Sequence, residues 1–437
     1  MLLVYSPRFS YRLEYILDLF LKELLGAEYS ICSDEQEFLL HQGPKFSYCE
    51  KPIGQEPFFY ATTLLFERGI RQQEIAVFDW EGSKAFFATH PKFLMPFDPF
   101  AAAFYLVTRY EEYLPGQRDS HGRFDARQSL AWQKGFLQQA VVNRWANRIG
   151  DILQKQFPAL ALKRPEYKYI STIDIDNAWA FKEKGLLRTI GALVRALINL
   201  DGQAIAERLG VLGGRKHDPY DTYAELDRIR DEYGVECRYF FLLGDYDEYD
   251  RNVSVSRRNF RSLIKSIADY NPVGIHPSYR SNEEPQRIRM EQNRLSKIVR
   301  RDIHHSRQHF LRLSMPETYR RLIDCDITDD YTMGFAQDIG FRAGTCTSYL
   351  FYDLSAEQTT SLRIHPFTVM DATLRNYLLL KPDEVMARVK PLIIETMKNG
   401  GTFMTLWHNE SLSEKAPWNE WSGIYEEIVK VAVKKNT

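Results

Sequence analysis

Two aspartates, Asp174 and Asp176, stand at the end of an apolar, β-rich stretch that reads YKYISTIDIDNAW. Residues spaced i and i+2 on an extended chain point to the same side, so both carboxylates should face one cleft. Such a pair can bind a cation or move a proton. Acidic residues at a strand end are also common turn and cap residues, so the pair alone does not identify a site.

Three further reactive side chains follow predicted strands. His276 follows the strand 273–275, His408 follows the strand 402–407, and Arg342 lies in the sequence GFRAGTC. The carboxyl ends of parallel strands meet at one edge of an α/β sheet or barrel, where sites are built. We therefore expect these side chains to join the two aspartates in an active site. Each also has an ordinary structural reading, as a loop histidine, an ion-pair partner or a cap.

The other histidines of this half carry weaker signals. His309, in SRQHFLRL, alternates with apolar residues and either faces the site or is buried. His304 and His305 end a charged helix and are expected to be solvated. His365 lies on a strand, where a structural role is expected.

The residue types favour one kind of chemistry. Carboxylate and imidazole ligands suit a divalent cation such as Zn²⁺, Co²⁺, Ni²⁺ or Fe²⁺ better than Ca²⁺ or Mg²⁺. A second aspartate can then act as a base, a histidine on the opposite side as an acid, and an arginine can orient the base. This set of groups fits attack of water on a carbonyl.

The elements that must position these residues form a regular series. Strand-like and helix-like segments alternate about seven times after the proline-flanked stretch 158–165. The helix 382–398, for example, begins with Pro382 and ends at Gly400 and Gly401. This alternation predicts a parallel sheet, either open or closed into a barrel.

Residues 1–160 are predicted to form a separate, smaller α/β domain of unknown role. A strand is expected at Leu2–Tyr5, a helix at Tyr11–Leu25 and a further strand at Glu37–Leu40. The histidines of this part, His41, His90 and His121, are isolated, and no catalytic group of residues is expected here.

Composition limits the possible partners and compartment. The 437 residues include 57 basic and 58 acidic side chains, so overall charge favours neither nucleic acid nor an anionic membrane as a partner. No signal-peptide pattern and no apolar run of membrane-spanning length is present. The five scattered cysteines predict free thiols in a reducing compartment. These features predict a soluble cytoplasmic protein.

Four motifs together resemble a known family. TIDID, GIHPSYRS, GFRAGT and LWHN occur in this order on a predicted β/α chain. They resemble the main motifs of the polysaccharide deacetylases, a family of metal-dependent carbohydrate esterases. The resemblance implies an α/β fold in which a distorted (β/α)₇ barrel, residues 165–437, follows a smaller α/β domain, residues 1–160. The first part looks like the uncharacterised domain that precedes such barrels in some bacterial members.

The resemblance also implies a metal site. Asp174 matches the base and Asp176 the metal-binding aspartate, although Ile175 separates a pair that is adjacent in many members. His276 matches the first histidine of an H-x-x-x-H motif, but the second position is Arg280. Either the third ligand comes from elsewhere, with His309 the best candidate, or the metal is bound weakly, or metal chemistry is lost. A divalent transition metal, zinc first, is the implied cofactor.

Three further positions receive roles by the same resemblance. Arg342 matches the arginine that holds the base aspartate. Asp371, in VMDATL, resembles an acidic position that pairs with the acid histidine or with the arginine. His408 matches the histidine that protonates the leaving group.

Three functions remain open from the sequence. The first is metal-dependent hydrolysis of an N- or O-linked acetyl group on a glycan or glycan precursor. The second is a non-catalytic sugar-binding or scaffold protein with an incomplete metal site, which Arg280 favours. The third is hydrolysis of another amide by the same site. Metal analysis of the purified protein distinguishes the first two.

Overall fold

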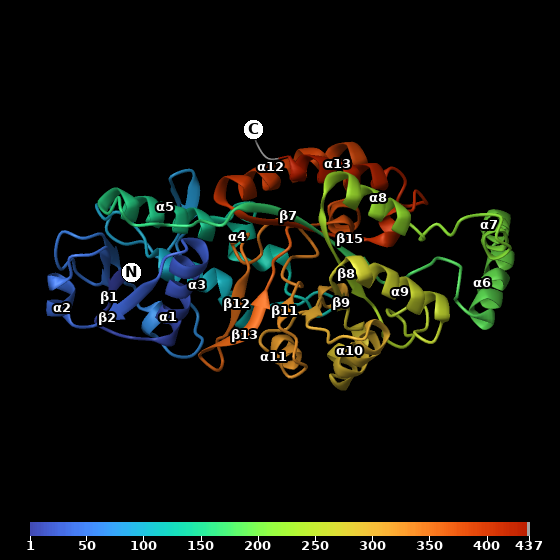
Figure 1. The fold of residues 1–437 in the computed structure, drawn as a ribbon, viewed down its shortest axis with the longest axis horizontal. Helices are drawn as coiled ribbons and strands as arrows, with labels where there is room; N and C mark the ends of the chain where they lie inside the picture. Colours follow the sequence, from blue (N-terminus) through green and yellow to red (C-terminus); the bar gives the residue numbers. More distant parts are fainter. Residues whose placement is uncertain (435–437) are drawn as a thin grey trace.

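The computed structural model describes residues 1–434. The molecule is elongated, with the N-terminal part at one end and helices α6 (Leu186–Ile198) and α7 (Gly202–Leu212) standing off at the other (Figure 1). A large sheet with helices on both sides occupies the middle.

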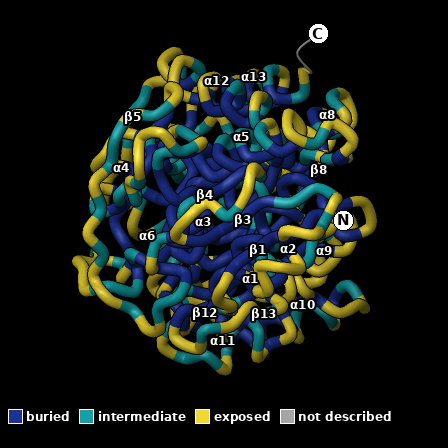
Figure 2. The backbone as a smooth tube through the Cα atoms, turned by 90° about the vertical axis from the view of Figure 1, so that its left-hand side faces the viewer, coloured by how far each residue is buried: buried dark blue, intermediate teal, exposed yellow. Residues whose placement is uncertain are grey.

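The N-terminal part is built on a four-stranded parallel sheet with the order β2-β1-β3-β4. Its strands are β1 (Leu2–Tyr5), β2 (Tyr29–Cys32), β3 (Lys45–Cys49) and β4 (Phe58–Tyr60), and β5 (Phe78–Trp80) pairs with β6 (Ser83–Ala85) in a hairpin. Its α-helices are α1 (Tyr11–Leu17), α2 (Glu35–Leu40), α3 (Pro99–Val107), α4 (Leu130–Gln133) and α5 (Val141–Gln156). Figure 2 shows β1 and β3 buried at the centre of this end of the molecule.

One element of this part differs from the prediction. The strand at Leu2–Tyr5 is confirmed, and the expected helix is present as α1 with its π-helical continuation Asp18–Leu24. The strand predicted at Glu37–Leu40 is wrong, because these residues belong to α2. The Asp34 carboxylate accepts hydrogen bonds from the backbone N–H groups of Gln36 and Glu37, and this cap begins a helix.

The C-terminal part contains a nine-stranded sheet with the order β12-β13-β11-β10-β9-β8-β7-β15-β14. Only β12 and β13 pair antiparallel, and all other neighbours are parallel. The strands are β7 (Tyr167–Ile175), β8 (Glu236–Phe241), β9 (Val273–Ile275), β10 (His305–Ser306), β11 (Asp329–Asp330), β12 (Tyr349–Asp353), β13 (Gln358–Ile364), β14 (Val369–Met370) and β15 (Gly401–His408). The helices are α8 (Tyr223–Tyr233), α9 (Arg258–Tyr270), α10 (Gln286–Val299), α11 (Glu317–Ile323), α12 (Pro382–Asn399) and α13 (Trp421–Val433).

This sheet is open. β12 and β14 are its outer strands, and no strand pairing joins them within residues 1–434. β12 turns back antiparallel to β13 and so does not extend the parallel series. The predicted α/β class is confirmed, whereas the predicted (β/α)₇ barrel is not seen as a closed sheet.

The order of strands places the site. β7 lies between β8 and β15, and Asp174 is in register with His408 on one side and Phe240 on the other. The carboxyl ends of β9, β10 and β14 lie at the same edge, since all these strands are parallel. Residues that follow these strands therefore approach Asp174 and Asp176.

One cluster of buried apolar side chains runs through both parts of the chain. It includes Leu2 of β1, Trp145 of α5 and Ile173 of β7. Polar contacts also cross between the parts, as between Arg144 of α5 and Glu395 of α12 at 2.7 Å. The N-terminal part therefore packs on the C-terminal sheet as part of one core.

The five cysteines lie buried as free thiols. Within residues 1–434, no helix combines the length and the apolar character needed to cross a bilayer.

Candidate metal centre and active site

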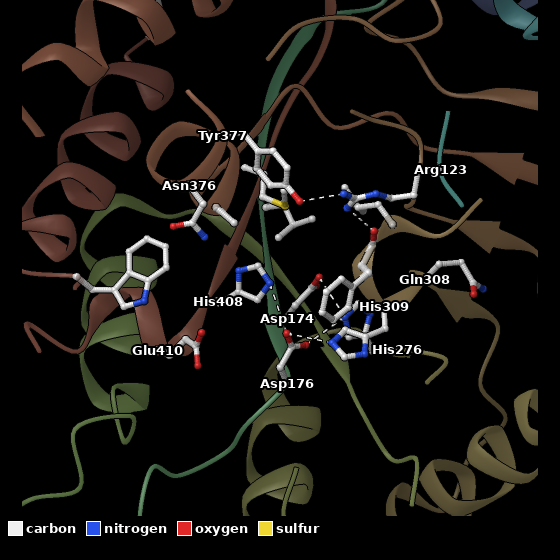
Figure 3. Close-up of a pocket in the computed structure, with 16 residues that line it drawn as sticks. Arg123, Asp174, Asp176, His276, Gln308, His309, Asn376, Tyr377, His408 and Glu410 are labelled. Atoms are coloured by element: carbon white, nitrogen blue, oxygen red, sulfur yellow. Dashed lines mark hydrogen bonds and ion pairs between the residues drawn. The ribbon is translucent and has the colours of Figure 1, made fainter. Parts of the chain in front are cut away.

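Asp174 and Asp176 line one cavity at the carboxyl end of β7 (Figure 3). Their neighbours Ile173 and Ile175 are fully buried in the main apolar core, so alternation along the strand directs the two carboxylates to the other side. The cavity has a volume of about 220 Å³.

Asp176, His276 and His309 form a compact group of potential ligands. The Nε2 atom of His276 lies 3.2 Å from Asp176 Oδ1, and the Nε2 atom of His309 lies 3.4 Å from Asp176 Oδ2. One ligand atom from each residue lies within 4.8 Å of the others. One carboxylate and two imidazoles are a donor set found in catalytic zinc sites. We call these three residues the ligand group.

Each histidine of the ligand group is oriented through its other ring nitrogen. His276 Nδ1 lies 2.6 Å from the carbonyl oxygen of Arg307, and His309 Nδ1 lies 2.9 Å from Asp250 Oδ1. Both contacts leave Nε2 directed toward Asp176. A carbonyl or carboxylate behind a histidine ligand is the usual arrangement in metal sites.

The ligand group fits a divalent cation. Asp176 Oδ1 is buried and accepts no hydrogen bond, which is costly for a carboxylate oxygen without another partner. Burial lowers the pKa of His309, but the Asp176 and Asp250 carboxylates outweigh burial and raise it to about 9. These residues therefore favour a positive charge at the point where their ligand atoms converge.

Asp174 is held by an arginine that the sequence analysis missed. Arg307 Nη1 donates hydrogen bonds to Asp174 Oδ1 at 3.0 Å and to Thr172 Oγ1 at 2.6 Å. Arg307 is fully buried and follows β10 directly, two residues before His309. The second oxygen of Asp174, Oδ2, lies 3.6 Å from His276 Nε2. Asp174 is thus fixed beside the ligand group.

The prediction that Arg342 holds Asp174 is wrong. The Arg342 guanidinium donates to both carboxylate oxygens of Glu112, at 2.9 and 2.6 Å, and to the carbonyl oxygen of Gly334 at 2.8 Å. Glu112 also pairs with Arg109 at 2.7 Å. Because all three charged side chains are buried, the donors of Arg342 are committed to this cluster and join the two parts of the chain.

His408 lies across the cavity from the two histidines of the ligand group (Figure 3). Its Nε2 atom lies 3.7 Å from Asp176 Oδ2, and its Nδ1 atom lies 2.9 Å from Asp371 Oδ1. Asp371 was predicted to pair either with the acid histidine or with the arginine, and it contacts the histidine, His408. Burial lowers the pKa of His408, but Asp371 outweighs burial and raises that pKa well above its usual value. A histidine held in this way by a carboxylate can donate a proton.

Arg280 lies outside the site. Its guanidinium pairs with Asp247 and Glu284, both at 2.7 Å, and about half of its side chain is exposed. Of the alternatives raised by the sequence, the geometry matches a third donor from His309.

The cavity includes residues that the sequence analysis did not identify. Arg123, from the N-terminal part, donates to the Tyr377 hydroxyl and to the carbonyl oxygen of Phe310, both at 2.9 Å. It lies in the polar stretch 116–126, where no motif marked it. Burial, together with nearby carboxylates, raises the pKa of Glu410 to about 7. Its position two residues after His408 could have marked Glu410 as a lining residue.

Residues 2–158 match the model of a family of unknown function (DUF7033). No curated protein matches the chain.

Several solved structures are similar to part of the chain at low identity. A protein from Mycobacterium smegmatis assigned as a polysaccharide deacetylase is 13% identical, with a TM-score of 0.40, over 62% of this chain and 85% of that one. A protein from Pseudomonas aeruginosa PAO1 assigned to the same class is 10% identical, with a TM-score of 0.38, over 62% and 85%. The 4-alpha-glucanotransferase from Thermococcus litoralis is 13% identical, with a TM-score of 0.36, over 63% and 38%. At these values the function must be argued from the site itself.

Proposed function

We propose that the protein is a metal-dependent hydrolase that removes an N- or O-linked acetyl group from a glycan or a glycan precursor. The proposal depends on one observation. A buried carboxylate, Asp174, and a carboxylate-oriented imidazole, His408, each lie within 3.7 Å of a member of the ligand group. A base and an acid beside a metal site are what attack of water on a carbonyl requires.

The proposed roles follow from the contacts. A divalent cation held by the ligand group would supply Lewis acidity. Asp174 accepts a proton from the attacking water, and its ion pair with Arg307 keeps the carboxylate fixed. His408 donates a proton from Nε2 to the leaving nitrogen or oxygen, while Asp371 holds Nδ1. The buried surroundings strengthen these electrostatic contacts and limit competition from bulk water.

The lining of the cavity supports a sugar as the substrate. The volume of about 220 Å³ suits one small unit of a glycan. Trp418 and Tyr377 offer aromatic surfaces, and Asn376, Glu410 and Arg123 offer polar groups. An acetylated sugar presents both an apolar ring face and hydrogen-bonding groups.

Zinc is the metal we propose, because three protein ligands with an open position are the pattern of catalytic zinc sites. The free cysteines support a reducing compartment, such as the cytoplasm. The non-catalytic alternative depends on a missing third ligand. His309 belongs to the ligand group, so we do not favour that alternative.

Metal content and acetate release together test the proposal. The purified protein is analysed for bound metal, stripped with a chelator and reloaded with Zn²⁺, Co²⁺ or Ni²⁺. We expect roughly one ion per chain. Acetate release from acetylated amino-sugar oligomers or acetyl-sugar esters should stop on stripping and return on reloading.

A matched pair of variants controls this experiment. His309→Ala should lose the metal and the activity, whereas Arg280→Ala, at the surface position that departs from the family motif, should retain both. A protein that binds no metal, or that no metal activates, would contradict the proposal. Activity on another acyl amide but on no acetylated sugar would favour the third function.

A further inference from the structure

Helices α6 and α7 form an arm that projects from the end of the molecule opposite the N-terminal part (Figure 1). The arm is inserted between β7, which carries Asp174 and is followed directly by Asp176, and α8. Within the 13 residues of α6, no side chain is buried. Such a helix lacks the tertiary cover that normally stabilises an apolar sequence.

One face of α6 is an exposed apolar stripe. Helical spacing places six large side chains within about a third of the helix circumference. They are Leu186, Leu187, Ile190, Val194, Leu197 and Ile198, with between 48% and 87% of each exposed. Less exposed residues such as Ala192 and Ala196 lie on the other side of the helix. Soluble monomers rarely expose an apolar surface of this kind without a partner.

The charges of the arm are mostly positive. Residues 182–216 contain seven Lys and Arg against three Asp and Glu. Each of the three acids has a polar partner. Glu183 accepts a hydrogen bond from Asn259, Asp201 caps α7 by accepting from the backbone N–H of Ala204, and Glu207 pairs with Lys415 at 2.7 Å.

Several cations of the arm are unpaired. Within residues 1–434, the ion pairs of the arm join Lys182 to Asp221, Glu183 to Arg257 and Glu207 to Lys415. Arg195, which lies beside the apolar stripe, and the exposed Arg215 and Lys216 form none. The charge that the arm leaves uncompensated is therefore positive. An apolar helix face with a free cation beside it, in a segment of net positive charge, is the pattern of a helix that lies in the interface of an anionic membrane.

We propose that the arm docks on a membrane surface that contains anionic lipids, with the apolar stripe of α6 inserted between the headgroups. The helix lies flat, because 13 residues rise only about 20 Å, well short of the bilayer core. This inference is independent of the proposed hydrolase function.

A second copy of the chain fits the same face less well. Packing two arms stripe to stripe would cover the apolar side chains, but it would bring two sets of unpaired cations together. The repulsion would oppose that association, whereas anionic headgroups neutralise the same charges.

Docking would also hold the cavity near the lipid. Glu207 of α7 pairs with Lys415. The backbone N–H of Trp418 donates to the backbone carbonyl oxygen of Lys415 at 2.7 Å. Trp418 lines the cavity of the candidate site. The root of the arm is thus joined to the cavity wall through a few residues.

Sedimentation of the full-length protein with vesicles tests the proposal. Vesicles of phosphatidylcholine and phosphatidylglycerol in equal amounts should bind the protein, and vesicles of phosphatidylcholine alone should bind it at least about tenfold less. The triple variant Leu187→Ser, Val194→Ser, Leu197→Ser should bind the mixed vesicles about tenfold more weakly. Arg195→Glu should weaken binding about fivefold or more, and added salt should remove that difference.

A matched variant at the other end of the molecule serves as the control. Leu40→Ser changes a side chain of α2 that is 74% exposed, and it should bind as the wild type does. Unchanged circular dichroism establishes that the variants are folded. Failure of the wild type to bind mixed vesicles, or undiminished binding of the triple variant, would overturn the proposal. So would light scattering that shows a dimer, broken by the triple variant, without vesicle binding.

Discussion

Asp174 lies in β7 and Asp176 directly follows it, yet their contacts give them different chemistry. Asp174 is paired with an arginine, and Asp176 faces two imidazoles. The guanidinium of Arg307 holds the Asp174 carboxylate in a fixed orientation beside the ligand group. A carboxylate with a buried, unsatisfied oxygen is suited to bind a metal ion.

The first prediction separates these two roles. Asp174→Asn keeps the shape of the side chain but cannot act as a base, so we expect turnover to fall about 10²–10⁴-fold with metal still bound. Asp176→Asn should lose metal instead. Elemental analysis and acetate release measure both effects. Loss of metal in Asp174→Asn would mean that the two aspartates have the opposite roles.

The second prediction compares two arginines. Arg307→Lys should lower kcat at least about tenfold with metal retained, since a lysine cannot span both Asp174 and Thr172. Arg342→Lys should leave kcat nearly unchanged and lower the free energy of unfolding by about 1–3 kcal/mol. Kinetics and urea denaturation of both variants provide the test. A catalytic defect in Arg342→Lys without loss of stability would contradict this account and support Arg342 as the arginine that holds Asp174.

At this scale, the sequence predicted residues better than it predicted partners. Asp174, Asp176, His276 and His408 were identified because they end parallel strands. Arg307 was missed because a two-residue strand leaves almost no periodic pattern before it. An arginine side chain is long, so a motif such as GFRAGT indicates roughly where Arg342 lies but not which carboxylate its guanidinium contacts.

At the scale of elements, the cluster of Arg342, Glu112 and Arg109 joins the segment after α3 to the loop before β12. Burial raises the pKa of Glu112, but the two guanidinium groups outweigh burial and lower it from 4.5 to about 2. A pKa that is lowered in the folded state stabilises the protein above the unfolded value. That stabilisation is lost as the pH falls from about 4.5 toward 2.

The third prediction is therefore acid sensitivity that depends on Glu112. Its contribution to the free energy of unfolding should be of the order of 3 kcal/mol at neutral pH and should disappear near pH 2. Glu112→Gln should be less stable by about 3–5 kcal/mol at neutral pH, because it leaves buried cations uncompensated. The difference between the variant and the wild type should shrink as the pH falls. Denaturation curves at several pH values measure it, and a constant difference would contradict this account.

Helices with strong apolar periodicity were predicted correctly, whereas a short helix that depends on a capping contact was not. The helix Tyr11–Leu25 has clear apolar spacing, and the structure contains it. The segment 37–40 is too short to show a period, so the capping contact of Asp34 outweighed its β-like composition.

At the scale of the whole molecule, one apolar cluster links the two parts. The fourth prediction is that residues 1–160 and 165–437, proposed from the sequence as two domains, unfold together. Scanning calorimetry should give a single transition, because separating the parts would expose a shared core. Two resolved transitions would show that each part is stable alone.

Two features at this scale could not be predicted from the sequence. Helical spacing indicates that α6 has an apolar face, but not whether another element covers it. The balanced overall charge of −1 conceals the positive charge of the arm, so composition alone does not predict binding to an anionic membrane. The open sheet depends on the reversal of β12, which strand-like composition does not encode.

The central claim is that Asp176, His276 and His309 hold a catalytic metal ion. A crystal loaded with Zn²⁺ and measured on both sides of the zinc absorption edge tests it directly. We predict one anomalous peak at about 2.0–2.2 Å from an Asp176 oxygen and from the Nε2 atoms of His276 and His309. No peak at this group, or a peak held by other residues of the cavity, would contradict the claim.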